Sequence, residues 1–347
     1  MFLITYSALS EGDYMKKLRV VQIGIKHDHA ADATLTLKEL KGDFELLGVV
    51  EENPLFLLKA KENPDYSGAP FISFEEALKL SPDAFLIETE EKLLVPTAKK
   101  VLEAGFNVYM DKPGSEDKDS FREICELAKS KNLVLFLAYM YRYNPAIMYA
   151  KKMVEEGKLG EIISVEAQMN CSYSDPEKRK WLGEFKGGMM FFLGCHLIDL
   201  VASIQGFPNE VIPLNCATGL EGVNSLDYGF CAYKYDKGIS FVKTNATECN
   251  GFNRRQLVIT GSKGTIEIKP LEVTVGEGRL VKKSYARQTI GIDGKWEDNS
   301  VPLDFEPQGR YVKMLLEFKK CVTGEIQNPY TYEYEAKLHD LIIDSCK

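Results

Sequence analysis

The sequence lacks both the cysteine spacing of a zinc ribbon and the basic clusters of a nucleic-acid-binding protein. Its eight cysteines are scattered, and no two form a CxxC pair, which argues against a structural zinc site and a compact disulfide framework. The net charge of -8 comes without any compensating Lys/Arg-rich block, so phosphate backbones and anionic membranes are not attracted. We expect a cytoplasmic protein with reduced thiols that binds neither nucleic acid nor membrane.

Long apolar runs are also missing, and none is long enough to span a membrane. An apolar patch lies near the start, but no basic residue precedes it, and Glu11 and Asp13 follow it. This pattern is untypical of a signal peptide, so residues 1–15 are predicted to be a loose extension. The length of 347 residues and the 45% hydrophobic content favour two domains beyond it.

Short apolar runs alternate with longer amphipathic ones from Leu18 onward, which is typical of strand and helix units that build a parallel sheet. The predicted strands are 18–24, 44–50, 84–88, 107–110 and 133–138. Asn53-Pro54 indicates a helix start, Ser73 and Glu76 have the spacing of a capping box, and Gly105 indicates a helix end. We predict a doubly wound α/β domain of the Rossmann type over residues 16–140.

The second half changes to the period-two alternation of antiparallel strands. Two strands joined by the turn Asp236-Lys237-Gly238 are predicted at 228–235 and 239–247. The other elements expected here are a helix from Pro145 to Gly157, strands at 256–260 and 264–269, and helices at 309–322 and 333–346. Residues 141–347 are therefore predicted to form an α+β domain with a large, mostly antiparallel sheet.

The loop after the first strand is where a Rossmann domain binds the phosphates of a dinucleotide. Compared with the pattern GxGxxG, only Gly24 is kept, and Lys26 stands where the backbone normally approaches the pyrophosphate. Lys26 either obstructs the cofactor or pairs with a phosphate, and an ordinary corner without a ligand is a third interpretation. The candidate cofactor-binding residues of this loop are Gly24, Lys26, His27, Asp28 and His29.

Glu51 ends the second predicted strand about 20 residues after this loop, where an acid typically binds the adenosine ribose. A carboxylate there repels a 2′-phosphate, so NAD is predicted in preference to NADP. Glu52 is the neighbouring candidate, and an exposed acid without a ligand is the alternative for both. His27 and His29 stand two residues apart with no adjacent acid or cysteine cluster, so we predict a solvated or phosphate-facing pair and no catalytic metal.

A series of motifs follows in a characteristic order along almost the whole chain. They are the run 83–89, Asp111-Lys112-Pro113, Arg142 with Pro145, the run 157–162, Gly187-Gly188, Gly194-Cys195-His196 with Asp199, and the run 261–265. In this order the chain resembles the Gfo/Idh/MocA oxidoreductases, in which Glu-Lys-Pro stands in place of Asp111-Lys112-Pro113.

The resemblance implies an enzyme that oxidises or reduces a hydroxyl or carbonyl carbon of a sugar, an inositol or a related molecule with NAD(P). It also implies a homodimer or homotetramer built through the sheet domain. Lys112 would be the catalytic lysine beside the nicotinamide, and His196 would face the substrate from the other domain. Thr89, Asp111 and Lys112 would flank the cofactor.

The chain departs from the family pattern at two places near the expected active site. Thr89-Glu90-Glu91 and Leu94 replace Thr-Pro-Asn and a following histidine, which alters the contacts near the nicotinamide ribose. Phe192 stands where the family often has an aspartate four residues before His196. Phe192 would make the surroundings of His196 drier, and Asp199 is predicted to orient the imidazole instead.

Hydride transfer needs a group that moves the hydroxyl proton, and Lys112 is the best-placed candidate, with His196 second. The candidate substrate-binding residues are Lys112, Trp181, Phe192, His196 and Asp199, and Arg142 joins the cofactor set with Thr89 and Glu90. The predicted function is an NAD-linked oxidoreductase for a sugar-like or polyol substrate. The alternatives are a redox-inactive ligand-binding or regulatory protein, and an enzyme that uses bound NAD for a net non-redox reaction.

Overall fold

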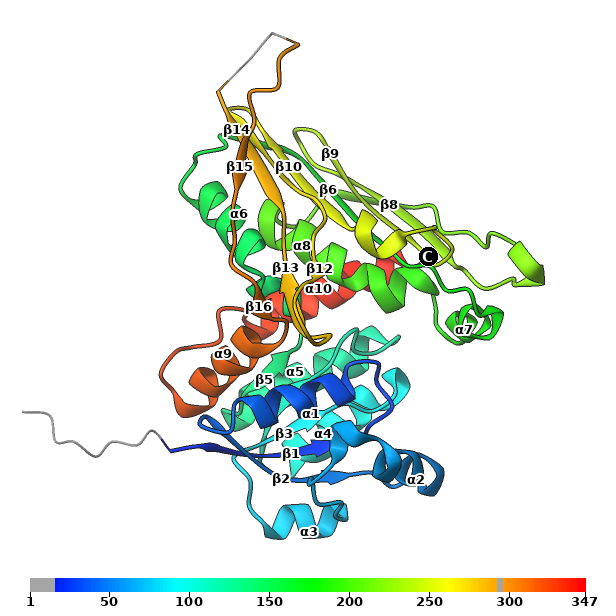
Figure 1. Ribbon diagram of the computed structural model, residues 1–347, viewed down its shortest axis with the longest axis vertical. Helices are drawn as coiled ribbons and strands as arrows, with labels where there is room; N and C mark the ends of the chain where they lie inside the picture. The colour runs from blue at the N-terminus through cyan, green and yellow to red at the C-terminus, as the bar shows by residue number, and fades with distance from the viewer. Residues whose placement is uncertain (1–15, 292–295) are drawn as a thin grey trace, which may run out of the picture.

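Two large sheets occupy opposite ends of the computed structural model, which describes residues 16–291 and 296–347 (Figure 1). The first sheet has five parallel strands in the order β2-β1-β3-β4-β5. Their bounds are β1 Leu18–Ile23, β2 Phe44–Val50, β3 Ala84–Ile87, β4 Asn107–Met110 and β5 Leu135–Leu137. A single parallel bridge from Val49 to Phe71 continues the pairing beyond β2. The predicted doubly wound sheet is confirmed, and each predicted strand of this half is present.

Helices connect these strands and cover the sheet, which explains why its central strands are apolar on both faces. The helices are α1 Ala30–Glu39, α2 Pro54–Glu62, α3 Phe74–Lys79, α4 Leu94–Glu103 and α5 Lys118–Lys131. The Asn53 side chain caps α2 by accepting the Leu55 and Phe56 amides. Ser73 and Glu76 form the predicted capping box at the start of α3. These local signals are confirmed by the structure.

The second sheet has eight strands in the order β15-β14-β11-β10-β6-β9-β8-β7, and all pairs are antiparallel except β6 with β9. The strands are β6 Ile162–Asn170, β7 Glu210–Pro213, β8 Tyr228–Lys234, β9 Ile239–Asn245, β10 Gln256–Gly261, β11 Gly264–Ile268, β14 Ala286–Ile290 and β15 Val301–Leu303. A small third sheet joins β12 Val273–Thr274, β13 Val281–Lys283 and β16 Gln308–Gly309. The predicted antiparallel architecture and the hairpin turn at 236–238 are confirmed.

Helices pack on one face of the large sheet and leave the other face partly open. The helices of this half are α6 Pro145–Glu155, α7 Pro176–Trp181, α8 Cys195–Gln205, α9 Val312–Thr323 and α10 Tyr332–Ser345. Shorter helical turns are η1 Pro64–Tyr66, η2 Glu91–Leu93, η3 Met140–Tyr143, η4 Leu182–Glu184, the π-helical η5 Met190–Gly194, η6 Leu220–Gly222 and η7 Gly251–Arg254. Phe230 and Phe241 stack on each other on the face of the sheet away from α8.

The end of the chain returns to the first sheet domain, because α10 packs against α5. Lys118 of α5 pairs with Asp344 of α10 at 2.9 Å, and Lys129 pairs with Glu333 at 2.5 Å. All strands of the first sheet lie within the predicted domain 16–140, and all later strands lie within 141–347. In Figure 1, α9 and α10 lie between the two large sheets.

Candidate active site

The loop after β1 turns at Gly24, whose φ of +87° lies in the left-handed region. A Cβ at this position would come within 2.6 Å of the Thr89 backbone, so a side chain does not fit. The loop runs directly against the end of β3, where the His27 amide donates to the Glu88 carbonyl at 3.2 Å. The single glycine that the loop retains is therefore the one that this close approach requires.

A cavity of about 300 Å³ lies at the carboxyl ends of β1, β2 and β3, and we refer to it as the first cavity. It collects six predicted cofactor residues: Gly24, Lys26, Glu51, Glu52, Thr89 and Glu90. The Glu51 carboxylate is held at this edge by accepting the Asn53 amide at 2.8 Å. The Lys26 ammonium lies 5.3 Å from the centroid of the Phe56 ring, and both residues line the cavity.

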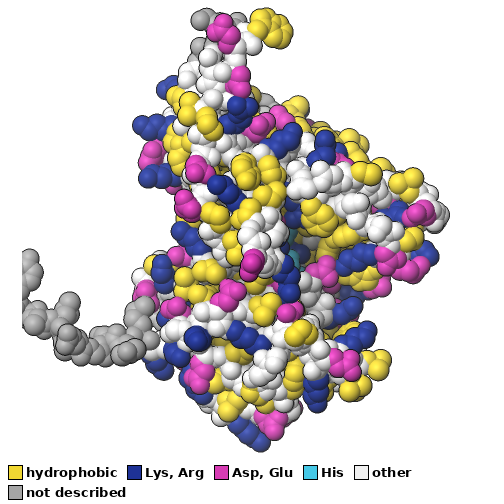
Figure 2. All heavy atoms as spheres, viewed as in Figure 1, with side chains coloured by type: hydrophobic (Ala, Val, Ile, Leu, Met, Phe, Trp, Pro, Cys, Tyr) yellow, Lys and Arg dark blue, Asp and Glu magenta, His cyan; other side chains and the backbone are white. Residues whose placement is uncertain are grey.

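A second cavity of about 300 Å³ lies between the two halves of the molecule. Its lining contains the predicted residues Asp28, His29, Lys112, Phe192 and His196. Figure 2 shows a hollow between the two halves in which a histidine lies beside Lys and Arg side chains. Trp181 is not among the lining residues, but its ring packs 5.0 Å from the Phe192 ring and supports that wall.

Lys112 follows β4 and is nearly fully buried, with 2% of its surface exposed. Its Nζ donates to the Phe192 carbonyl at 3.4 Å and lies 4.8 Å from the centroid of the Phe192 ring. One long hydrogen bond and a ring face compensate only part of the cost of burying an ammonium. Lys112 therefore retains hydrogen-bonding capacity for an oxygen atom that enters the second cavity.

His196 lies in the first turn of α8, and the rings of Tyr139 and Tyr141 meet it edge-on at 5.9 and 5.2 Å. Its buried Nδ1 has no hydrogen-bond partner among the residues that the structure describes. Burial, and after it the charge of Lys112, lowers the pKa of His196 well below its usual value. The imidazole is therefore neutral near pH 7.

Asp199 does not orient His196 as predicted, because Asp199 and Arg142 bind each other. Arg142 donates to Asp199 at 2.8 to 3.1 Å and to Glu335 of α10 at 2.5 and 3.1 Å. All three residues are buried, and neither Arg142 nor Asp199 lines the first or the second cavity. Asp199 is occupied by the guanidinium and so does not orient His196.

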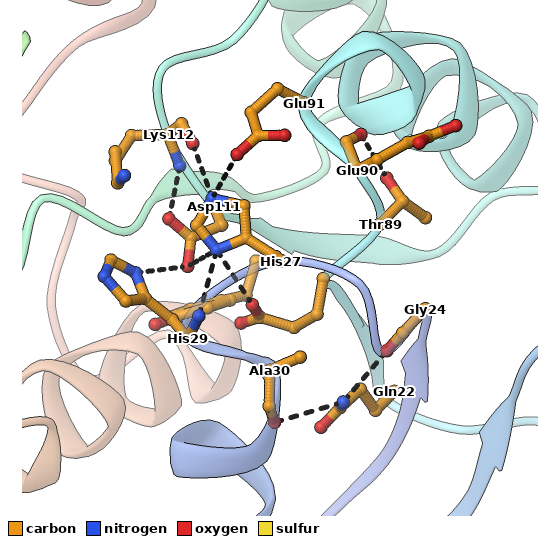
Figure 3. Close-up of polar contacts among 12 residues, drawn as sticks. Gln22, Gly24, His27, His29, Ala30, Thr89, Glu90, Glu91, Asp111 and Lys112 are labelled. Carbon is orange, nitrogen blue, oxygen red and sulfur yellow. Dashed lines mark hydrogen bonds and ion pairs between the residues drawn. The ribbon is translucent and has the colours of Figure 1, made fainter. Parts of the chain in front are cut away.

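His27 and His29 form a buried cluster with Asp111, which follows β4 (Figure 3). The Asp111 Oδ2 atom lies 2.9 Å from His29 Nδ1 and 3.3 Å from His27 Nδ1. Burial lowers the pKa of His27 to about 3, and the two histidines hold the pKa of Asp111 below its usual range despite burial. The interpretation of a solvated histidine pair is wrong for His27, because its side chain is inaccessible to solvent.

A second buried acid, Glu88, lies beside this cluster at the end of β3. Its Oε2 is 3.8 Å from His27 Nδ1, and neither carboxylate oxygen has a hydrogen-bond partner among the described residues. Burial and the neighbouring charge of Asp111 raise the pKa of Glu88 well above its usual value. Burial and Asp111 thus favour the neutral form of the Glu88 carboxyl group.

Sequence reasoning missed a polar network on the opposite wall of the second cavity. Glu272 accepts hydrogen bonds from Tyr141 Oη at 2.6 Å and from Arg310 Nε at 2.9 Å, and it pairs with Arg255 at 3.4 Å. Against the cost of burial, Arg310 and then Arg255 lower the pKa of Glu272 to about 2. These residues are far apart in the sequence and belong to no local motif, so the fold alone brings them together.

The parallel sheet, the acid at the end of β2 and the lysine after β4 define a two-domain protein whose first domain has a nucleotide-binding fold. The family model described as "Oxidoreductase family, NAD-binding Rossmann fold" matches residues 18–139, and the model "GFO/IDH/MocA C-terminal domain" matches residues 147–267. The chain belongs to the Gfo/Idh/MocA family of oxidoreductases. The resemblance seen in the sequence is thereby confirmed.

Two curated relatives align with part of the chain. An uncharacterized oxidoreductase of Escherichia coli, YhhX, is 33% identical over 153 residues, which are 44% of each chain. Levoglucosan dehydrogenase of Pseudarthrobacter phenanthrenivorans is 26% identical over 132 residues, which are 36% of this chain and 34% of the relative. The aligned part therefore spans less than half the length of either relative.

A solved structure extends the similarity in fold to nearly the whole molecule. The WlbA dehydrogenase from Bordetella pertussis, in complex with NADH and UDP-GlcNAcA, superimposes with a TM-score of 0.73. The match covers 95% of this chain and 97% of that one at 19% identity.

Within the described residues, no helix combines the length and apolar character needed to cross a membrane.

Proposed function

We propose that the chain is an NAD(H)-linked dehydrogenase or reductase that acts on a hydroxyl or carbonyl carbon of a sugar-like or polyol substrate. The observation that carries the proposal is that Lys112 of the first domain and His196 of the second line one cavity. Similarity to levoglucosan dehydrogenase and to the WlbA dehydrogenase supports a sugar-like substrate class.

The residues of the first cavity fit the adenosine half of a dinucleotide. Gly24 leaves the space in which the chain passes close to β3, and Glu51 presents a carboxylate suited to two ribose hydroxyls. The same carboxylate disfavours a 2′-phosphate, which supports NAD over NADP. Lys26 remains at the wall beside Phe56, where its ammonium can pair with a phosphate.

The bound nicotinamide would supply the hydride acceptor or donor. In the reducing direction, the Lys112 ammonium donates a hydrogen bond and then a proton to the carbonyl oxygen of the substrate. In the oxidising direction, the amine accepts the hydroxyl proton. Neutral His196 lines the cavity, where its imidazole can hydrogen-bond to a second hydroxyl and orient the reacting carbon. The wall formed by Trp181 and Phe192 keeps this end of the cavity dry.

The experiment is to follow absorbance at 340 nm while the protein is mixed with NADH and carbonyl sugars, or with NAD and polyols. The proposal expects turnover with at least one sugar-like substrate and a lower KM for NAD(H) than for NADP(H). Bound NADH without turnover across the panel would favour a regulatory protein. Substrate conversion with bound NAD and no net absorbance change would favour a non-redox reaction.

We also propose that the chain forms a homodimer or homotetramer through the open face of the eight-stranded sheet. The stacked aromatic pair Phe230 and Phe241 is half-buried on that face, and aromatic residues are enriched at interfaces. The mass of the particle, measured by light scattering, tests this proposal directly. A monomeric mass at micromolar concentration would contradict it.

A further inference from the structure

Three groups that can bind metals come together beside the second cavity from two separate segments of the chain. His27 and His29 belong to the loop before α1, and Asp111 follows β4. One ligand atom from each side chain lies within 4.8 Å of the others. In Figure 3 both imidazole rings point toward the Asp111 carboxylate.

The hydrogen bonds of His27 fix which of its ring nitrogens carries the proton. Nε2 lies 3.1 Å from the Lys112 carbonyl, and because a carbonyl only accepts, this nitrogen carries the hydrogen. Nδ1 accepts the His29 amide at 3.3 Å, so this nitrogen carries no proton, and a metal ion bound there would replace this long hydrogen bond. Nδ1 and the Asp111 Oδ2 atom are both acceptors, yet they lie only 3.3 Å apart.

This pattern is the one found around metal-bound histidines. A ligating imidazole typically donates its other N–H to a carbonyl or carboxylate, and a ligating carboxylate is itself hydrogen-bonded. Asp111 satisfies the second condition, since its Oδ1 accepts the Lys112 amide at 2.7 Å. The outer contacts that orient the ligands are therefore already formed.

Glu88 is a second, independent observation that indicates a missing cation. Its carboxylate is fully buried and unpartnered within the described part of the chain, and its Oε2 lies 3.8 Å from the lone pair of His27 Nδ1. Buried acids of this kind are normally paired or bound to metals. Two carboxylates, from Glu88 and Asp111, balance the charge of a divalent ion.

We propose that His27 Nδ1, His29 Nδ1 and Asp111 Oδ2 bind one divalent transition-metal ion, with Glu88 beside them as a second carboxylate that balances its charge. Zn²⁺ is the best match to two imidazoles and a carboxylate. Bonds of about 2.0–2.1 Å in a tetrahedron place ligand atoms about 3.4 Å apart. Asp111 Oδ2 lies 2.9 Å from His29 Nδ1 and 3.3 Å from His27 Nδ1, close to this value, and without an ion the shorter contact is a hydrogen bond. The sequence predicted no catalytic metal because no acid stands near His27 and His29 along the chain. Asp111 is distant in the sequence, and the fold brings it to the two histidines.

The site lies outside the first cavity and next to the second. His29 lines the second cavity, whereas His27, His29 and Asp111 do not line the first. An ion at this position therefore lies beside the cavity that holds Lys112. Metal binding is testable without cofactor or substrate, so its failure and a failure of the proposed dehydrogenase activity are distinguishable.

The test is to strip the full-length protein with a chelator, add Zn²⁺ or Co²⁺ and remove excess ion by gel filtration. We expect one ion per chain by elemental analysis and a visible absorption band from the Co²⁺ form. His29→Asn and Asp111→Asn should each weaken binding by at least about 100-fold, more than the 10–100-fold typical of losing an outer contact. Glu88→Gln should weaken it as well.

His196→Asn is the matched control, because it removes a histidine from the same cavity that is not a ligand, and it should keep one ion per chain. Circular dichroism of each variant checks that it is folded. A wild-type protein that takes up no Zn²⁺ or Co²⁺ would overturn the proposal and assign the cluster to proton sharing between Glu88 and Asp111. Equal binding by wild type and folded His29→Asn would overturn it too.

Discussion

Lys112 is the residue on which the proposed chemistry depends. Replacing it by methionine keeps the bulk of the buried stem but removes the proton donor, so turnover should fall by about 10²–10⁴-fold. Steady-state rates at 340 nm measure this change, and the Kd for NADH should change much less. Lys99→Met on the exposed surface, where Lys99 pairs with Glu123, is the control and should retain full activity. A Lys112→Met enzyme with normal turnover would contradict the assignment of Lys112 as the proton donor.

Glu51 is expected to decide between NAD and NADP. In Glu51→Gln the repulsion of a 2′-phosphate disappears, and the ratio of the Kd values for NADPH and NADH should fall by about tenfold, which corresponds to about 1.4 kcal/mol. Fluorescence titration of both reduced cofactors measures the ratio. Glu52→Gln is the matched neighbour and should leave the ratio unchanged. A ratio that falls in Glu52→Gln and stays unchanged in Glu51→Gln would assign the ribose contact to Glu52.

The sequence indicated residues well where a local pattern carries the signal. Glu51 and Lys112 each follow a predicted strand, and Glu51 lines the first cavity while Lys112 lines the second. The sequence failed where the partner is distant along the chain. Asp111 completes the cluster with His27, and Asp199 is paired with Arg142, and neither contact has a signature within one element.

At the scale of elements, a buried ion-pair network ties η3, α8 and α10 together. Arg142, Asp199 and Glu335 contribute one side chain from each element. Asp199→Ala should lower the free energy of unfolding by about 3–5 kcal/mol, because it leaves part of a buried charge unpaired. Denaturant unfolding measures this loss. The Kd for NADH should stay unchanged, and a variant of normal stability would contradict the structural role of this network.

α10 also makes stability depend on pH through His339, which stacks on Phe121 of α5 at 4.1 Å. Burial lowers the pKa of His339 to about 4 from 6.5. Between these values the unfolded chain binds more protons, so the free energy of unfolding falls as the pH drops, by up to about 1.4 kcal/mol per pH unit.

In His339→Gln this contribution is absent, so the slope of the unfolding free energy against pH should be smaller between pH 6.5 and 4. Urea unfolding at several pH values measures both slopes. The comparison concerns slopes, so a uniformly less stable variant still gives a clear answer. Identical slopes in the two proteins would show that His339 is not buried in its neutral form.

Elements with strong local signals were predicted well, as the capped helices α2 and α3 and the hairpin β8–β9 show. Strands β6, β7, β14 and β15 of the large sheet were not predicted, and neither were β12, β13 and β16 of the small sheet. The three strands of the small sheet are very short. Each has two or three residues and pairs only because distant segments meet, so alternation is too short to detect. The π-helical turn η5 was not predicted either, because no sequence period indicates such a turn.

At the scale of the whole molecule, the two halves share the candidate site. The first domain supplies Lys112 and Glu51, and the second supplies His196 and the network around Glu272. The contact of α10 with α5 joins the halves behind the site. The change from a parallel to an antiparallel sheet was predictable from the change in hydrophobic period. The return of the last helix to the first domain was not predictable, because no local pattern indicates it.

The most direct test of the account is a titration of NADH into the wild-type protein, followed by its thermal unfolding. The account predicts one dinucleotide per chain and a transition that rises with concentration, with a gain of about 2.7 kcal/mol at 100 times the Kd. No binding and an unchanged transition at millimolar NADH would contradict it, because the proposed hydride chemistry would then have no cofactor.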